Sequence, residues 1–308
     1  MLDITLESRS HTKSGREFAI DDQELATRKT IYAPDMMAGK RVVVSGGGTG
    51  IGKATALLFA RLGADVAICG RREELLDSAA DLIADTTGRK VMKRVLNIRD
   101  ADAVERFLAD VHDELGGIDI LINNAGGQYV QDAVDISRKG WMAVIETNLN
   151  GTWWMMQEAA KQWIARKQPG SIINVVCVVE RGCPQVVHTC ASRAGVIYAS
   201  KSVAVEWAPH GIRVNCLAPG ATKTEGFRQY PEENLDQFYQ NPLRSTSDAF
   251  EMAETMAYMS SPAAAFMTGE LIALDGGQQL WGNSWLYGKP AWYSDDWSRG
   301  WNPANKAE

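Results

Sequence analysis

Short apolar runs alternate with helix-like segments along most of the chain. Runs of strand length, rich in apolar and β-branched residues, occupy 41–45, 65–69, 91–98, 118–126, 171–179, 213–220 and 270–277. The segments between them have helical spacing: Leu58 and Leu62, for example, lie four positions apart and would share one face of a helix. This order predicts an α/β fold, with a parallel sheet whose crossovers are right-handed.

Less regular segments lie on both sides of this periodic part. Residues 1–38 are polar and lack clear periodicity, which indicates an N-terminal extension on the surface of a single domain at 39–280. The C-terminal tail at 281–308 holds five of the ten tryptophans, so it is expected to pack rather than to be disordered. It is interpreted as a belt on its own or a neighbouring subunit, or alternatively as a lid or wall of a substrate pocket. The segment 220–247 is predicted to be the substrate-binding lid.

Composition narrows the classes of function. The net charge of −6 argues against a general nucleic-acid binder, which needs a basic surface to neutralise phosphates. No apolar run approaches the roughly 20 residues of a membrane-spanning helix, and the N-terminal residues are too charged for a signal peptide, so a cytoplasmic protein is expected. The five cysteines show no CxxC spacing and the four histidines no ligand spacing, which predicts reduced thiols and no structural metal.

The strongest local signal is SGGGTGIG at 45–52, between the first predicted strand and helix of the domain. The glycines permit a tight turn and a close approach to a pyrophosphate, and the helix N-terminus offers free N–H groups. Such a loop can be only a flexible turn, but its place after the first strand favours a dinucleotide site. The predicted contacts are Ser45, Gly46, Gly48, Thr49, Gly50, Ile51 and Gly52.

Several motifs in sequence order resemble the short-chain dehydrogenase/reductase family. The loop is similar to the family's TGxxxGxG, with Ser45 in place of Thr. After it come NNAG at 123–126, Asn148 within TNLNG, APG at 218–220 and DGG at 275–277. The resemblance covers nearly the whole domain and implies a Rossmann fold, a doubly wound seven-stranded parallel sheet in a single domain. It also implies a nicotinamide cofactor and a homodimer or homotetramer.

The same resemblance implies further cofactor contacts. These are Asn97 and Ile98 near the adenine, Asn124, Ala125 and Gly126 on the adenosine side, and Pro219, Gly220, Thr222 and Thr224 around the nicotinamide and the phosphates. An NAD site usually has Asp or Glu at the end of the second strand, where it binds the ribose 2′-hydroxyl. Here Gly70 is followed by Arg71 and Arg72, and a guanidinium can bind a 2′-phosphate. The sequence therefore predicts NADP(H) over NAD(H), unless both arginines only begin a surface helix.

The catalytic positions depart from the family's pattern. The family's set is Asn, Ser, Tyr and Lys, with Tyr as the general acid/base and Lys on the nicotinamide ribose. Asn148 is present, but alignment of the downstream helix places Thr189 at the Tyr and Arg193 at the Lys. The Ser position falls on Val176 or Cys177. Cys177 is a candidate for substrate contact, or otherwise a small buried side chain.

Other side chains are alternative acids. Tyr198 and Lys201 resemble the family's Tyr and Lys, but they are three residues apart rather than four. Tyr198 also lies roughly on the opposite helix face from Thr189. Glu180 and His188 are further candidates. His188 titrates near neutral pH, yet it lies one residue away from the catalytic face, and a packed or solvent-facing side chain is the favoured interpretation.

Thr189 and Arg193, at the positions of the family's Tyr and Lys, favour one kind of reaction. The hydroxyl of Thr189 donates a hydrogen bond but does not ionise near neutral pH, and Arg193 supplies a positive charge on the same helix face. Hydride addition to a C=C bond conjugated to a carbonyl suits this site, because donors stabilise the enolate and water can protonate it.

The segment VHTCASRAGV at 187–196 resembles the branch of peroxisomal trans-2-enoyl-CoA reductases, 2,4-dienoyl-CoA reductases and citronellol dehydrogenase-like proteins. We therefore expect an NADP(H)-dependent reductase of a small hydrophobic substrate, an enal or a CoA thioester. Two alternatives stay open. One is a dehydrogenase of hydrophobic alcohols or ketones, with His188 or Tyr198 as acid/base. The other is a catalytically silent NADP(H)-binding scaffold or sensor.

Overall fold

The main sheet is fully parallel. A computed structural model of the chain describes residues 19–229 and 241–280. Its strands are β1 (Arg41–Ser45), β2 (Asp65–Gly70), β3 (Met92–Val95), β4 (Ile120–Asn123), β5 (Gly170–Val175), β6 (Ile212–Pro219) and β9 (Leu271–Leu274). They pair in the order β3-β2-β1-β4-β5-β6-β9, and the short β7 (Thr222–Lys223) and β8 (Ser247–Asp248) pair separately. The predicted seven-stranded Rossmann sheet is confirmed.

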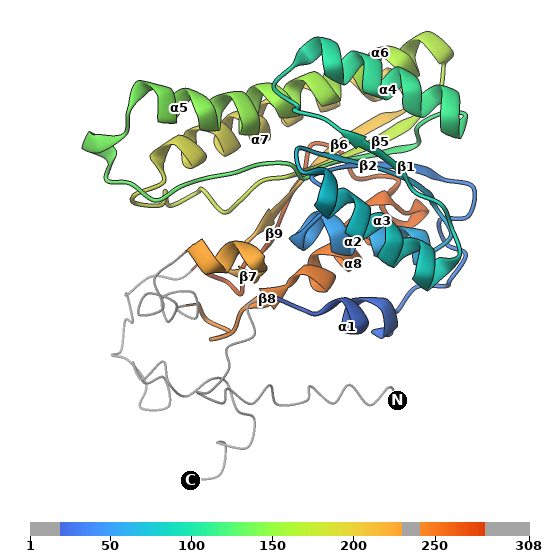
Figure 1. Cartoon of the computed structure of the whole chain (residues 1–308). Coiled ribbons are helices and arrows are strands. Elements are labelled where there is room, and N and C mark those ends of the chain that lie inside the picture. Colours follow the sequence, from blue (N-terminus) through green and yellow to red (C-terminus); the bar gives the residue numbers. More distant parts are fainter. Residues whose placement is uncertain (1–18, 230–240, 281–308) are drawn as a thin grey trace.

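Helices cover both faces of the sheet. They are α1 (Asp22–Thr27), α2 (Gly50–Arg61), α3 (Glu73–Thr87), α4 (Ala101–Leu115), α5 (Arg138–Ile145), α6 (Thr152–Arg166), α7 (Val187–Trp207) and α8 (Ala249–Ser260). A π-helical turn, η2 (Glu146–Gly151), joins α5 to α6, and short 3₁₀ turns include η1 (Ala133–Asp135), η3 (Ala208–His210), η4 (Glu225–Gln229) and η6 (Pro262–Ala264). Helices α2, α3 and α8 lie on one face, and α4, α5, α6 and α7 on the other (Figure 1). None of the described helices is long and apolar enough to cross a membrane.

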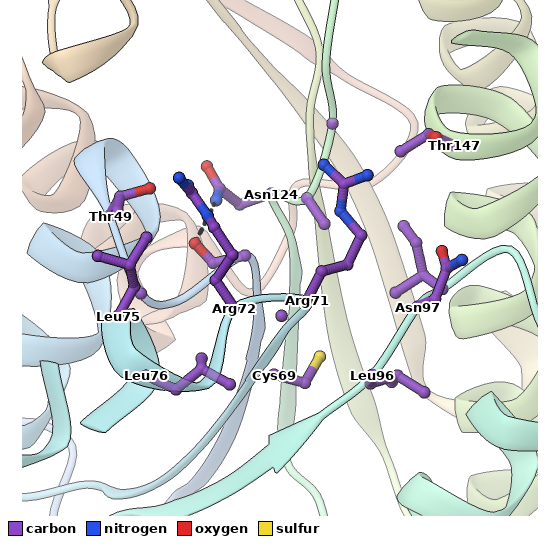
Figure 2. A pocket seen from close by; sticks show the side chains of 16 residues that line it. Thr49, Cys69, Arg71, Arg72, Leu75, Leu76, Leu96, Asn97, Asn124 and Thr147 are labelled. Carbon is purple, nitrogen blue, oxygen red and sulfur yellow. Dashed lines mark hydrogen bonds between the residues drawn. The ribbon is translucent and has the colours of Figure 1, made fainter. Parts of the chain in front are cut away.

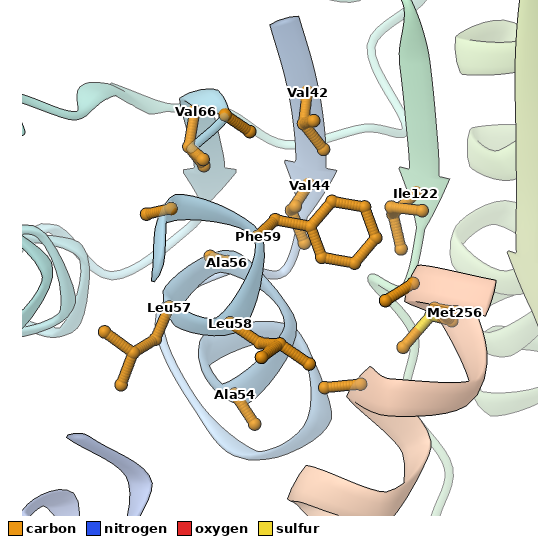
Figure 3. Close-up of a cluster of buried hydrophobic side chains, with 14 of the residues drawn as sticks. Val42, Val44, Ala54, Ala56, Leu57, Leu58, Phe59, Val66, Ile122 and Met256 are labelled. Carbon is orange, nitrogen blue, oxygen red and sulfur yellow. The ribbon is translucent and has the colours of Figure 1, made fainter. Parts of the chain in front are cut away.

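Packing of α2 fixes the position of the loop before it. Phe59 of α2 is fully buried between Val44 of β1, Ile122 of β4 and Met256 of α8 (Figure 3). Burial of one such side chain stabilises the fold by about 1.5–3 kcal/mol. The helix that begins at the glycine-rich loop is therefore held rigidly against the sheet.

The described part of the predicted extension is integrated into the domain. Leu25 and Met37 are almost completely buried in the same core as α2 and α8. Arg28 forms an ion pair with Asp248 at 2.7 Å, so α1 is joined to the start of α8. The extension therefore contributes core side chains in addition to covering the surface, while residues 1–18 and the Trp-rich tail lie outside the described residues.

The strand order places a crevice beside β1. The chain runs outward to β2 and β3 on one side of β1, and returns to β4 and β5 on the other. In open α/β sheets, ligands bind at the carboxyl ends of the strands where the order reverses in this way. The loops after β1, β2, β3 and β4 meet at this point.

Candidate active site

The loop after β1 has no room for side chains. Gly46 and Gly50 have φ values of 68° and 51°, in the left-handed region that favours glycine. A Cβ at Gly52 would lie 2.2 Å from the carbonyl oxygen of Gly46, so only glycine fits there. Thr49, the N-cap of α2, makes no side-chain capping hydrogen bond with the described residues. The N–H groups of the first turn of α2 are therefore available to phosphate oxygens.

Ser45 supports the loop and does not face a ligand. Its side chain is fully buried, and Oγ accepts hydrogen bonds from the N–H groups of Asn124 and Ala125, both at 3.1 Å. Asn124 in turn donates from Nδ2 to the carbonyl oxygens of Ser45 and Gly46, both at 3.2 Å. These bonds hold the loops after β1 and β4 together, so Ser45 fixes the shape of the glycine-rich loop.

A cavity of about 180 Å³ lies in front of these loops. Ten of the predicted cofactor residues line it: Gly46, Gly48, Thr49, Arg71, Arg72, Asn97, Ile98, Asn124, Ala125 and Gly126. The sequence analysis missed Cys69, Gly70, Leu75, Leu76, Leu96 and Thr147, which also line it. The leucines supply apolar walls that suit a planar base. Leu96 directly follows β3, and Leu75 and Leu76 lie in the first turn of α3, the helix after β2.

Two arginines from the end of β2 extend over this cavity. In Figure 2, the Arg72 side chain reaches between Thr49 and Asn124, and Arg71 lies between Asn124 and the residues Asn97 and Thr147. Neither guanidinium forms an ion pair with a described residue. Both cations are therefore available to a phosphate group of a ligand in the cavity.

Asn148 projects from the π-helical turn η2. It is fully buried, donates from Nδ2 to the carbonyl oxygen of Gly127 at 3.0 Å, and accepts from the N–H of Gly127 at 2.9 Å. Its Nδ2 also lies 3.4 Å from Oγ of Ser192 on α7. Single π turns inside helices are frequent at functional sites. Here the turn joins Asn148 to both the loop after β4 and the catalytic face of α7.

Arg193 is a buried cation that forms no ion pair with any described residue. Its side chain lies against Gly126, where a Cβ would be 2.0 Å from Nη2. The residue is 7% exposed, and Nη1 has no hydrogen-bond partner among the described residues. Burial lowers the pKa of Arg193, although a guanidinium remains charged at neutral pH. Burying an unpaired charge costs several kcal/mol, so this arrangement fits a polar or anionic ligand group.

Thr189 and His188 are joined at the start of α7. The N–H of Thr189 donates to Nδ1 of His188 at 2.8 Å, and Nε2 of His188 has no partner among the described residues. The His188 ring is fully buried and packs edge-on against Tyr129, with 4.5 Å between ring centroids. Burial lowers the pKa of His188, so the ring is neutral at pH 7. This confirms a packed histidine, not a solvent-facing one.

Cys177 follows β5 and lies near Arg193. Burial raises the pKa of Cys177 to about 11, and the positive charge of Arg193 offsets only part of this effect. The thiol is therefore protonated at neutral pH and can act as a weak hydrogen-bond donor. Val176, the other residue at the predicted Ser position, is buried in an apolar cluster with Val196 and Ile197.

Two of the alternative acids, Tyr198 and Glu180, are exposed, whereas His188 contacts Thr189. Tyr198 is 69% exposed, and Nζ of Lys201 lies 5.3 Å from its ring centroid. Glu180 is exposed as well. The predicted helix phase is thus correct: Thr189 and Arg193 are buried on one face of α7, and Tyr198 points outward.

The loop after β6 reaches the glycine-rich loop. Pro219 ends β6, and a Cβ at Gly220 would lie 2.6 Å from Cα of Asp275, so the chain is closely packed there. Thr222 shares a hydrogen bond with Ser247 at 2.8 Å. A Cβ at Gly50 would lie 3.3 Å from Cγ2 of Thr224, which places this loop beside the start of α2. Residues 230–240 of the predicted lid lie outside the described residues.

A doubly wound sheet with a glycine-rich cradle and a nearby buried Asn and Arg defines a nucleotide-dependent oxidoreductase. The comparisons agree. The family described as enoyl-(acyl carrier protein) reductase matches residues 46–279. The chain belongs to the short-chain dehydrogenase/reductase family and is an NAD(P)-dependent oxidoreductase.

Similar proteins include reductases and a dehydrogenase. A probable 2,4-dienoyl-CoA reductase of Bacillus subtilis is 35% identical over 250 residues, or 79% of this chain and 98% of that protein. A peroxisomal 2,4-dienoyl-CoA reductase of Danio rerio is 31% identical, over 81% of this chain and 85% of that protein. A citronellol catabolism dehydrogenase of Pseudomonas aeruginosa has a similar structure, with a TM-score of 0.72 and 34% identity over 80% of this chain and 98% of that one.

Proposed function

We propose that the protein is an NADP(H)-dependent reductase of a C=C bond conjugated to a carbonyl, with an enoyl- or dienoyl-CoA thioester as substrate. The observation that carries this proposal is the buried guanidinium of Arg193, whose Nη1 has no partner among the described residues, on the same helix face as Thr189. The names of the two dienoyl-CoA reductase relatives support the substrate class. The absence of a tyrosine at position 189 supports a reaction that needs no strong general acid there.

The roles of the side chains follow from their charge. When bound, the cofactor supplies a hydride to the β- or δ-carbon of the conjugated system. Arg193 and the hydroxyl of Thr189 stabilise the negative charge that develops on the thioester oxygen, and Arg193 also binds hydroxyls of the nicotinamide ribose. Asn148 holds the loop after β4 against α7, through its bonds to Gly127 and Ser192. In this proposal Cys177, which is protonated at neutral pH, orients the substrate carbonyl, and water supplies the proton to carbon.

The preference for NADP(H) rests on Arg71 and Arg72. Both extend over the cavity, and Gly70 stands where an NAD site has a carboxylate. We expect the double variant Arg71→Ala/Arg72→Ala to bind NADPH at least roughly tenfold more weakly, because each charge-assisted hydrogen bond contributes about 1.5–3 kcal/mol. NADH affinity should stay unchanged.

Cofactor fluorescence titration measures both affinities. The control is Arg89→Ala, because Arg89 is paired with Asp65 at the start of β2, at the other end of the strand. A wild-type protein that binds NADH more tightly than NADPH would contradict the preference.

A second candidate is a dehydrogenase of hydrophobic alcohols or ketones. The name of the citronellol catabolism dehydrogenase favours it. It needs an acid/base at the substrate oxygen, and His188 is the better placed of the two predicted groups, because Tyr198 faces outward. The lowered pKa of His188 reduces its supply of protons at neutral pH, so this candidate ranks second.

Isotope transfer from NADPH deuterated at C4 separates the two reactions. A conjugated reductase places deuterium on the carbon β or δ to the carbonyl, and a ketone reductase places it on the new carbinol carbon. The assay uses an enoyl-CoA, a dienoyl-CoA, citronellal and a simple ketone. Turnover of the ketone alone, with label on the carbinol carbon, would overturn the first proposal.

Assembly and location stay predictions. Tyr198 and Val205 are 69% and 78% exposed on the outer face of α7, an apolar surface that a second copy would cover in a homodimer or homotetramer. Light scattering measures the assembly. A cytoplasmic location also stays a prediction, and the word peroxisomal in a relative's name describes that relative.

A further inference from the structure

Three cysteines gather around the start of α7. Cys177 follows β5, Cys183 lies in the loop between β5 and α7, and Cys190 lies in the first turns of α7. The sulfur of Cys190 is 3.8 Å from the carbonyl oxygen of Cys183. Burial raises the pKa of both Cys177 and Cys183, and the nearby Cys190 adds to both shifts, so the three side chains lie within electrostatic reach of one another.

We propose that Cys183 and Cys190 form a redox modification site, a dithiol that a hydroperoxide converts to a disulfide at the wall of the active site. Cys183 is exposed and Cys190 is partly exposed, so an oxidant in solution reaches both. Nothing in the proposed reductase reaction uses either thiol. The site is therefore independent of the proposed function.

The geometry brings the two residues together. A disulfide needs the two Cα atoms within about 7 Å and the sulfurs at about 2 Å. The 3.8 Å contact already brings the sulfur of Cys190 to the backbone carbonyl of Cys183, and the Cys183 side chain is exposed. Gly182, with φ of 71°, gives the preceding backbone the freedom to adjust.

The other cysteines are poorer partners. Burial raises the pKa of Cys177 and Cys216 to about 11 and that of Cys69 to about 12, so these thiols are protonated and slow to react. No group of three or more His, Cys, Asp or Glu among the described residues is arranged to hold a metal. The pair Cys183 and Cys190 is therefore better suited to oxidation than to metal binding.

The chemistry balances with a hydroperoxide as oxidant. The thiolate of Cys183 attacks the peroxide oxygen and breaks the O–O bond, giving a sulfenic acid and, with hydrogen peroxide, one water. The thiolate of Cys190 then attacks the sulfenic sulfur, the S–O bond breaks, and a second water leaves. The two thiols lose two electrons and two protons in total. A small dithiol reverses the reaction by exchange.

A disulfide between Cys183 and Cys190 would restrain the backbone on one side of the candidate catalytic residues. Cys190 directly follows Thr189, and Cys183 belongs to the loop that leads from Cys177 to α7. The cavity of the adenosine site contains neither cysteine. We therefore expect oxidation to lower turnover or substrate affinity while NADPH affinity stays within about twofold of that of the reduced protein.

Peroxide titration of the whole chain, followed by peptide mass spectrometry, tests this proposal. We expect a loss of two hydrogen masses, a cross-link between the peptides of Cys183 and Cys190, and reversal by dithiothreitol. The variants Cys183→Ser and Cys190→Ser should not form the link, and Cys183→Ser should keep its activity after peroxide treatment. Because the pKa of Cys183 is raised, the rate of its oxidation by peroxide should keep increasing with pH across the neutral range.

Three results would overturn the assignment. These are a cross-link from Cys177 to either cysteine in place of the predicted one, sulfenic or sulfinic acid without any cross-link, and a disulfide that persists in both serine variants. Hydrogen exchange of the segment 178–189 gives a readout that does not need a substrate. It should slow after oxidation in the wild type and stay unchanged in Cys183→Ser.

Discussion

Replacing Arg193 with methionine should stabilise the ligand-free protein and at the same time disable it. The guanidinium is 7% exposed, its Nη1 is unpaired, and no ion pair with a described residue offsets its burial. Methionine has a similar length, fills irregular spaces well and carries no charge to desolvate. The substitution therefore removes an electrostatic cost without opening a large cavity.

The expected size of the effect follows from the cost of buried charge. Apolar replacement of poorly compensated buried charges stabilises proteins by about 1–4 kcal/mol. In domains of about 150–250 residues, each kcal/mol shifts Tm by roughly 2–4 °C. The Tm of ligand-free Arg193→Met should therefore increase by at least about 2 °C. The proposed enoyl-CoA reductase activity should fall by about 100-fold or more, as for the loss of an oxyanion donor.

Arg213 provides a matched control. It is a partly buried arginine, and its guanidinium donates to Ser171 Oγ at 3.1 Å and to the carbonyl oxygens of Met267 and Met259 at 3.1 and 3.0 Å. Arg213→Met leaves these acceptors unpaired and should lower Tm. Thermal unfolding of both variants and of Arg193→Lys, each with and without NADPH, forms the assay.

Two outcomes would refute this account of Arg193. One is a ligand-free Arg193→Met protein that is no more stable than the wild type, because the charge would then be compensated by groups of the protein. The other is an Arg193→Met variant that keeps its turnover. Arg193→Lys restores a compact cation and should keep part of the activity, so it separates loss of charge from general damage to the site.

Three further predictions follow from the same region and from the sheet. Thr189→Val should lower turnover about 100-fold and leave NADPH affinity unchanged; unchanged turnover in steady-state assays would remove Thr189 from the mechanism. His188 has a lowered pKa, so the unfolded chain binds its proton more readily and stability should fall as pH drops below about 6.5. The stability of His188→Asn, measured by urea unfolding, should fall less than that of the wild type below this pH. The same pH dependence of stability in both proteins would contradict this account of His188. For Asp119, burial alone would raise the pKa, but the hydrogen bonds from Arg41 lower it. Arg41→Gln should therefore lower the free energy of unfolding by roughly 1.5–3 kcal/mol at neutral pH. Denaturant titrations should show that this difference between the variant and the wild type disappears only as the pH falls through the lowered pKa of Asp119.

Apolar patterning predicts the fold well because it records burial, and it overestimates strand length for the same reason. The predicted strand at 41–45 is confirmed in full, since both its ends coincide with turns. The run at 91–98 contains only the strand Met92–Val95, although Leu96 and Ile98 are also buried. Those two side chains belong to the loop that lines the cofactor cavity. Hydrophobicity alone cannot separate a buried strand from a buried loop at its end.

The site was less predictable where position depends on local backbone geometry. Ser45 occupies the predicted place in the motif, but its side chain points into the structure and supports Asn124 and Ala125. Thr147 lines the cavity because it lies in a π-helical turn, which the periodicity of an α-helix does not predict. The bond from Thr189 to His188 likewise depends on the irregular start of α7, where Val186 has φ of −133° and ψ of 37°.

The electrostatics of the site explain why Thr189 and Arg193, in place of the family's Tyr and Lys, are compatible with a working active site. Burial lowers the pKa of His188 and raises that of Cys177, so both side chains are neutral near pH 7. Asn148 and Thr189 do not titrate in this range, which leaves Arg193 as the full charge among these five candidate side chains. Such a group stabilises a developing anion strongly but transfers protons poorly. It therefore favours reactions in which hydride transfer to carbon comes first and solvent protonates the resulting enolate, and it disfavours reactions that need an acid at the substrate oxygen.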